Sequence, residues 1–199
     1  MALLAELAWR RANRVGKGAS VVWLVISALL LSRGLAMPAP TPTSPEYQLK
    51  AVFLFNFAQF VEWPPTAFPE PQTPLVIGVL GEDPFGAYLD ETVRGEKVNN
   101  RPLVVQRFRQ PEEIKHCHVL FISRSERDRL GQILPSLKGR NILTVGDAED
   151  FAGRGGMIRF VTEKNKIRLK INVEAAKAAD LTISSKLLRP AEIVTSGKE

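Results

Sequence analysis

The sequence is poor in the residues on which many enzymes depend. It has one cysteine, Cys117, and two histidines, His116 and His118, in 199 residues. A single cysteine excludes any disulfide within the chain. The histidines share one short segment and no nucleophile elbow is present, so the sequence shows no nucleophile, histidine and carboxylate triad. We therefore expect a non-enzymatic protein that has no cofactor and is stabilised by packing alone.

Clustered metal ligands are also absent. His116-Cys117-His118 resembles a ligand cluster, but a strand would direct the two histidines to one face and the cysteine to the other. We therefore expect a strand entrance with a small buried cysteine, and no metal site. Asp147, Glu149 and Asp150 lie in a polar loop, where we expect solvated carboxylates.

An apolar run long enough to cross a bilayer is missing from the N-terminal region. The run Val21–Leu31 has 11 residues, whereas a spanning helix needs about 20. Basic residues precede this run, and Gly34 and Ala36 supply small side chains at positions −3 and −1 of a cleavage site. This pattern predicts a secretory signal peptide over 1–36, cleaved after Ala36, and a periplasmic protein. The alternative is an uncleaved signal anchor, which Arg33 disfavours.

A strong excess of positive charge is absent outside that segment. The chain has a formal net charge of +6, but residues 1–36 hold five basic residues and one acidic residue. The remainder has 22 basic and 20 acidic residues, with no basic cluster interleaved with aromatics. A nucleic-acid partner is therefore not expected.

After the signal peptide, the composition predicts one folded unit. We assign 37–45 to a proline-rich linker, 46–195 to a single domain and 196–199 to a tail. Ser44 can cap a helix and Pro45 suits its first position. The helix then runs without Gly or Pro from Tyr47 to Trp63, where Pro64-Pro65 end it.

The predicted first helix is apolar around most of its circumference. Its apolar stripe includes Leu49, Val52, Phe53, Phe57 and Phe60, and we expect the three phenylalanines to lie in the core. A narrow solvated face is expected at Glu46, Lys50, Gln59 and Glu62. The surplus of apolar surface indicates either deep burial or a partner-binding surface.

A repeated strand and helix pattern follows, and predicts an α/β fold. Strands are expected at 75–80, 102–108, 118–122 and 141–145, with helical segments at 84–93, 111–115, 125–134, 173–179 and 184–188. Two further strands, 156–162 and 166–172, predict an antiparallel hairpin. We expect a three-layer α/β/α domain with a mostly parallel sheet that this C-terminal hairpin extends.

The second strand of the hairpin alternates cleanly. Its polar positions are Lys166, Arg168, Lys170 and Asn172, while isoleucine and leucine occupy the positions between them. One face of the hairpin is therefore predicted to contact water or a charged partner.

A ligand cleft is a second possibility, near the loop Gly81–Gly86 after the first strand. The loop lacks the Gly-Lys-Ser/Thr ending of a phosphate loop, and Glu82 and Asp83 would repel phosphate. We interpret it chiefly as a turn with Asp83 as a helix cap. Ser184 and Ser185 are interpreted as a helix N-cap, and with Gly81 and Asp83 they are the candidate cleft residues.

Several segments resemble the YfiR-like family of bacterial periplasmic proteins. The matching segments are Tyr47–Pro64, Val79–Phe85, Cys117–Ile122, Gly155–Ile158, Ile171–Asn172 and Ile183–Leu188. The resemblance implies a protein that binds and inhibits the periplasmic sensor region of a membrane-bound diguanylate cyclase, which lowers cyclic-di-GMP signalling and biofilm formation. Some relatives carry paired cysteines, which a chain with a single cysteine cannot copy.

Two classes of function therefore remain open. The first is a regulator whose candidate partner-binding residues are Asn56, Gln59, Trp63, Arg168, Lys170 and Asn172. A second copy of the chain is a further candidate partner. The alternative is a periplasmic small-molecule sensor or minor enzyme that uses a cleft near Gly81–Gly86.

Overall fold

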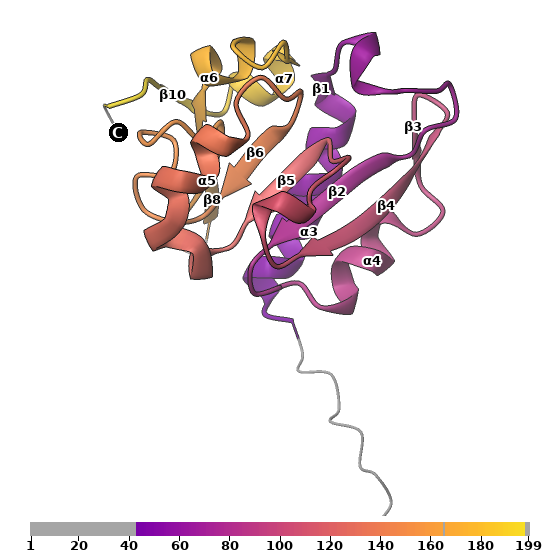
Figure 1. The fold of residues 1–199 in the computed structure, drawn as a ribbon. Coiled ribbons are helices and arrows are strands. Elements are labelled where there is room, and N and C mark those ends of the chain that lie inside the picture. Colours follow the sequence, from indigo (N-terminus) through magenta and orange to yellow (C-terminus); the bar gives the residue numbers. More distant parts are fainter. Residues whose placement is uncertain (1–42, 165, 198–199) are drawn as a thin grey trace, which may run out of the picture. The chain divides into compact units, whose positions relative to one another are not determined.

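A sheet of eight strands runs through the part of the chain that the computed structural model describes, residues 43–164 and 166–197 (Figure 1). The strand order is β10-β8-β7-β6-β5-β2-β4-β3, and neighbours are parallel except for the pairs β3–β4 and β7–β8. The strands are β2 (Leu75–Leu80), β3 (Lys97–Val98), β4 (Arg101–Phe108), β5 (Val119–Ile122), β6 (Leu143–Gly146), β7 (Ile158–Glu163), β8 (Lys166–Asn172) and β10 (Glu192–Val194).

Helices cover both faces of this sheet. The α-helices are α3 (Pro45–Phe60), α4 (Ala87–Val93), α5 (Leu130–Ser136), α6 (Val173–Lys177) and α7 (Ser185–Leu188). Three 3-10 helices accompany them, η1 (Pro65–Ala67), η2 (Pro111–Glu113) and η3 (Arg124–Arg129). Helices α3 and α4 lie on one face of the sheet and α5 on the other (Figure 1). In β2, Ile77 and Val79 belong to the core cluster that includes α3 and α4, whereas Val76 and Leu80 belong to the cluster that includes α5. The predicted three-layer α/β/α fold with a C-terminal hairpin is confirmed.

Helix α3 begins at the residue that the sequence predicts but ends before the predicted residue. The Ser44 side chain caps it by accepting a hydrogen bond from the Tyr47 N–H, and Pro45 is its first residue. It stops at Phe60 instead of Trp63, because β1 (Val61–Glu62) pairs in antiparallel fashion with β9 (Thr182–Ile183). The pairing of Val61 with Ile183, 122 positions away in sequence, overrides the local helical pattern.

Only one side of α3 is covered. Phe57 is fully buried, as predicted, while Phe53 and Phe60 are half-buried against the same core. Leu49 and Val52, which the sequence places in the apolar stripe, are 45% and 37% exposed. The surplus apolar surface of this helix is therefore not absorbed by the fold.

A buried ion pair fixes the N-terminal half of α3 to the sheet. Lys50 is 1% exposed, and its Nζ lies 2.7 Å from Asp147 Oδ2 and 2.7 Å from Glu46 Oε1. The predictions of a solvated Lys50 and a solvated Asp147 are both wrong. Each looks like a surface residue in its local segment, and only the packing of α3 against the end of β6 brings the two together.

Neighbouring groups extend this ion pair into a network. The Tyr47 hydroxyl donates to Asp147 Oδ2 at 2.7 Å, and burial together with that carboxylate raises the pKa of Tyr47 well above its usual range. The hydrogen bond from Lys50 lowers the pKa of Glu46. Thr162, in β7, donates to Glu46 Oε1 at 2.9 Å. The network thus ties α3 to both β6 and the hairpin.

The hairpin has its predicted strands but not all of its predicted exposed face. Leu169 and Ile171 join the core under α3, and Arg168 is exposed on the other face, as the alternation predicts. Asn172, expected on that exposed face, is fully buried. Its Oδ1 accepts from the Ala175 N–H at 3.0 Å as the cap of α6, and its Nδ2 donates to Ala152 O at 3.1 Å. The prediction of a surface role for Asn172 is therefore wrong.

The His116–His118 segment forms a strand entrance, as expected. Cys117 is buried, and burial raises its pKa to about 12. His118 is buried as well, with Nδ1 accepting from the Val76 N–H at 3.0 Å and Nε2 lying 3.2 Å from Ala67 O. Burial lowers the pKa of His118 to about 4, so its ring is neutral. His116 is exposed and precedes β5.

We predict that Asp147→Asn lowers the free energy of unfolding by roughly 3–5 kcal/mol, because it leaves the Lys50 ammonium buried without its partner. Urea denaturation measures this loss. The matched control is Asp150→Asn at an exposed position of the same loop, which should change stability by less than about 0.5 kcal/mol. Equal effects of the two variants would contradict the role of the ion pair.

We also predict that His118 makes stability fall in mild acid. Its folded-state pKa, about 4, lies below the unfolded value of about 6.5, so the unfolded chain binds the proton more tightly. The contribution of His118 is complete above pH 6.5 and is lost as the pH falls toward 4. Between pH 7 and pH 5 the loss should be about 1–2 kcal/mol.

Urea denaturation at both pH values measures this dependence. The loss should shrink in His118→Asn and persist in His116→Asn, a control at the exposed histidine. If His118→Asn keeps the full acid-dependent loss, another group is responsible.

Candidate partner-binding surface

The exposed side of α3 presents one continuous row of side chains. Leu49, Val52, Asn56 and Gln59 follow one another at intervals of three, four and three residues, which places them on one face of the helix. Leu49, Val52 and Gln59 are exposed and Asn56 is half-buried. We call these four residues the α3 face.

The α3 face carries no charge. Between Leu49 and Gln59 the one ionisable residue is Lys50, which is buried against Asp147. The side-chain amides of Asn56 and Gln59 form no hydrogen bond with any other residue in the described ranges 43–164 and 166–197. Solvent-facing sides of helices are usually polar and charged, so an uncharged row with apolar members is typical of a surface that contacts another molecule.

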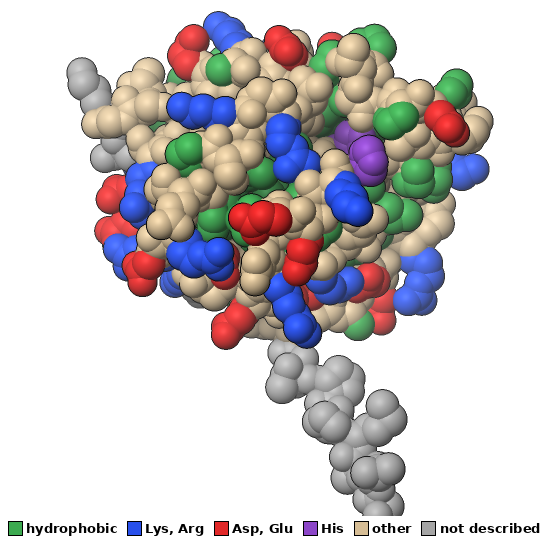
Figure 2. Space-filling view, viewed as in Figure 1, with side chains coloured by type: hydrophobic (Ala, Val, Ile, Leu, Met, Phe, Trp, Pro, Cys, Tyr) green, Lys and Arg blue, Asp and Glu red, His purple; other side chains and the backbone are tan. Residues whose placement is uncertain are grey.

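The opposite side of the molecule has a different character. Figure 2 looks onto the face that α5 covers, and there Lys and Arg side chains are interspersed with Asp and Glu. Such a mixed surface is typical of a solvated face. The contrast supports the α3 face as the candidate interface.

Trp63, a predicted partner-binding residue, lies beyond the C-terminal end of α3. Its half-buried ring packs edge-on against His118, with the ring centroids 6.2 Å apart. The Trp63 Nε1 atom is buried and finds no hydrogen-bond acceptor among the described residues. Trp63 also lines a cavity of about 260 Å³ together with Phe68 and Arg101. It therefore adjoins the α3 face without belonging to it.

Arg168 and Lys170, also predicted as partner contacts, lie across the sheet from α3. Because side chains alternate along β8, and Leu169 faces the α3 core, these two cations point to the other face. Each is near a carboxylate, with Arg168 Nε 3.4 Å from Glu163 Oε2 and Lys170 Nζ 3.4 Å from Glu192 Oε1. The six predicted partner residues thus do not form one surface.

The loop Gly81–Gly86 is packed and hydrogen-bonded within itself and to neighbouring residues. Asp83 accepts from the Phe85 N–H at 2.8 Å and from Arg107 Nε at 2.7 Å. Gly81 has a φ of +88°, and a Cβ atom placed there would lie 2.5 Å from Ser125 Oγ. The turn interpretation is correct, but Asp83 does not cap α4, which starts at Ala87 after Gly86.

The four candidate cleft residues are not brought together either. Ser184 caps α7, as predicted, and its N–H donates to Phe60 O at the C-terminal end of α3. The loop of Gly81 and Asp83 lies at the other end of that helix, where Thr43 donates to Phe85 O at 2.7 Å. Ser185 is an exposed residue of α7. Since α3 separates the two pairs, they form no common cleft.

Sequence reasoning missed Leu49 and Val52 as surface residues. Apolar side chains in an apolar helix are ordinarily assigned to the core, so the residue types of Leu49 and Val52 predicted burial instead of exposure. The available signal was the absence of charged residues on the exposed side, which becomes visible only once the buried position of Lys50 is known.

The described residues contain neither a candidate membrane span nor a candidate metal site. Over residues 43–164 and 166–197, no helix combines the length and apolarity that a membrane span requires. No group of three or more His, Cys, Asp or Glu residues within these ranges is placed to hold a metal ion. The predicted signal peptide over 1–36 lies outside the described residues.

Comparison with known proteins assigns the chain to a family. A family model described as YfiR/HmsC-like matches residues 47–192, well over half of the chain. Proteins of this family are periplasmic, are regulatory rather than catalytic, and are associated with diguanylate cyclases and cyclic-di-GMP signalling. No curated protein matches the chain significantly. The match runs from the first turn of α3 to the first residue of β10, and the chain therefore belongs to the YfiR/HmsC-like family.

Proposed function

We propose that this protein is a non-enzymatic periplasmic regulator that binds the periplasmic sensor region of a membrane-bound diguanylate cyclase and inhibits it. The observation that carries the proposal is the α3 face, an uncharged row of exposed and half-buried side chains in the first segment of the family match. Family membership supports the regulatory role, and the α3 face supports the site of contact.

The composition of the α3 face fits the centre of a protein interface. Such centres are depleted in charged residues and rich in apolar and aromatic groups. Leu49 and Val52 supply exposed apolar area, and the rings of Phe53 and Phe60 on the same helix are half-buried. Asn56 and Gln59 add amide groups that can bond to a partner's backbone.

The hairpin surface is a weaker candidate for the same contact. Arg168 and Lys170 each have a glutamate nearby, so a partner would have to compete with existing ion pairs. The α3 face has no such competition, because Asn56 and Gln59 lack hydrogen-bond partners within the described structure.

A catalytic role finds no support at the histidines. The two ring nitrogens of His118 lie at hydrogen-bond distance from backbone groups of Val76 and Ala67, and His118 is buried. A general base must reach the proton that it abstracts from a substrate. The buried ring of His118 is held by the backbone at both nitrogens and does not reach a substrate proton.

Inhibition across the membrane has a definite energetic requirement. An exported chain does not meet a cytoplasmic nucleotide, so its influence must pass through the membrane protein that it binds. An inhibitor acts by binding the inactive state more tightly than the active one. Reversing a ratio of 1:99 to 99:1 requires a differential affinity of about 5.5 kcal/mol, within reach of a modest apolar interface.

We predict that Val52→Lys abolishes inhibition while the protein stays folded. The change places a charge at the centre of the α3 face, and should weaken partner binding about 30-fold or more. Lysine has a higher helix propensity than valine, so the helix itself is retained. In a strain lacking the chromosomal gene, cyclic-di-GMP should fall on complementation with the wild-type gene and stay high with Val52→Lys.

The matched control is Ile193→Lys, which changes another exposed apolar residue, 53% exposed on β10. This variant should restore inhibition like the wild type. A cyclic-di-GMP level that does not change on gene deletion contradicts the regulator function. If Val52→Lys restores full inhibition, the α3 face is not the contact with the cyclase. That conclusion holds even if the Val52→Lys substitution dissociates a homodimer of this chain.

We further predict that the exported protein starts at Met37. N-terminal sequencing of protein from a periplasmic extract measures the cleavage site directly. Ala36→Arg should block processing, because the −1 position requires a small side chain. Recovery of the intact 21–31 segment in the membrane fraction would show a signal anchor instead.

A further inference from the structure

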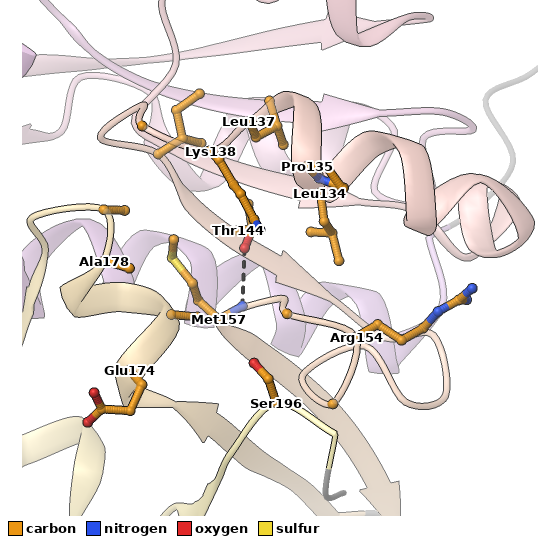
Figure 3. Close-up of a pocket in the computed structure, with 16 residues that line it drawn as sticks. Leu134, Pro135, Leu137, Lys138, Thr144, Arg154, Met157, Glu174, Ala178 and Ser196 are labelled. Carbon is orange, nitrogen blue, oxygen red and sulfur yellow. Dashed lines mark hydrogen bonds between the residues drawn. The ribbon is translucent and has the colours of Figure 1, made fainter.

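A cavity of about 580 Å³ opens at a site that the proposed function does not use (Figure 3). It lies between the C-terminal end of α5, the Gly153–Gly155 turn, helix α6 and Ser196. It is separate from the α3 face, none of whose residues lines it. Ligand sites in proteins usually have volumes of about 300–1,000 Å³, so this cavity can hold a small molecule.

The walls of the cavity are mostly apolar. Leu134, Leu137, Ile142 and Met157 are buried side chains that line it, and Ala175 and Ala179 of the α6 segment complete the wall. The alanines are short, which leaves the space beside α6 open. Figure 3 shows Leu134 and Leu137 on the α5 side of this space, with Met157 and Ala178 facing them.

Two polar side chains of the cavity, Thr144 and Ser196, are engaged in hydrogen bonds within the protein. Thr144 Oγ1 accepts from the Met157 N–H at 3.1 Å, the bond drawn in Figure 3. Ser196 Oγ lies 3.0 Å from Asn172 Nδ2. Because these groups are paired within the protein, the interior of the cavity favours an apolar occupant over a strongly hydrated one.

The charged groups at the rim differ in how they are engaged. Glu174 lies 3.2 Å from Lys177 Nζ, and Arg154 Nη1 donates to Arg127 O at 3.0 Å. The Lys138 ammonium has neither an ion pair nor a hydrogen bond with another residue in the described part of the chain. Of the two cations at the rim, Arg154 is already bonded to a backbone carbonyl, whereas the Lys138 ammonium is free of partners among the described residues and can pair with an anionic group.

We propose that this cavity binds a small amphipathic monocarboxylate, with its apolar body between α5 and α6 and its carboxylate at Lys138. The apolar walls remove the body from water, and the ammonium group of Lys138 neutralises the carboxylate at the rim. Aliphatic and aromatic monocarboxylates share this chemistry. The site is independent of the α3 face, so this inference does not rest on the proposed function.

Calorimetric titration of the purified exported protein tests the site with three probes. Decanoate and naphthalene-2-carboxylate represent the aliphatic and aromatic classes, and decyltrimethylammonium has the same aliphatic chain with the opposite charge. At least one carboxylate should bind with a one-to-one stoichiometry, about tenfold or more tightly than the cation. Absence of binding by both carboxylates, or equal binding of the cation, overturns the proposal.

Two variants locate the binding site. Lys138→Glu should weaken carboxylate binding about tenfold or more and abolish the preference over the cation. Its control is Lys166→Glu, at an exposed lysine of the hairpin. Ala178→Phe should weaken binding of both carboxylates by filling the space beside α6, and Ala87→Phe at the exposed start of α4 is its control.

Thermal melts of all four variants verify that each remains folded. Carboxylate affinity that is unchanged in both Lys138→Glu and Ala178→Phe would place the probe elsewhere on the protein and overturn the assignment. These binding experiments do not measure cyclic-di-GMP, so a negative result would not contradict the proposed role of the α3 face.

Discussion

The arrangement of this protein depends on the buried ion pair between Lys50 and Asp147. These residues are 97 positions apart, and their charged atoms lie 2.7 Å apart with almost no contact with solvent. A buried charge without a partner is costly, so α3 cannot rotate about its axis or slide along the sheet without losing this pair. Tyr47 and Glu46 strengthen the restraint, because their bonds reach Asp147 and the hairpin residue Thr162.

The rotation of α3 decides which of its apolar residues face outward. With Lys50 turned toward the sheet, Leu54 and Phe57 follow it into the core, and Leu49 and Val52 are left exposed on the other side. The helix thereby places its one cation inside and its uncharged residues outside, the reverse of an ordinary surface helix. The same interaction that anchors the helix thus creates the surface proposed for partner binding.

A short ribbon connects this surface with the proposed ligand cavity. Helix α6 forms part of the cavity wall, and the chain continues through Leu181 into β9. Strand β9 pairs with β1, which directly follows α3, and Ser184 bonds to the last residue of that helix. A ligand beside α6 and a partner on α3 would therefore act on segments that are joined by backbone hydrogen bonds.

Local patterns in the sequence determined the elements of this fold. Apolar runs bounded by turns predicted β2 and β8 with correct ends, the Ser44-Pro45 pair predicted the start of α3, and alternation predicted the exposed position of Arg168. Each of these features depends on residues within a few positions of one another, which a single sequence displays directly. The family assignment likewise followed from ordered local segments.

Only the tertiary structure decided which polar residues are buried and which apolar ones are exposed. Lys50 and Asp147 are buried because they form an ion pair with each other, and Asn172 is buried because it caps α6. Helix α3 ends at Phe60 because Val61 and Glu62 pair with β9. The cavity beside α6 is formed by segments spread from Leu134 to Ser196. Burial and cavity shape depend on contacts between segments distant in sequence, and local composition carries no information about such contacts.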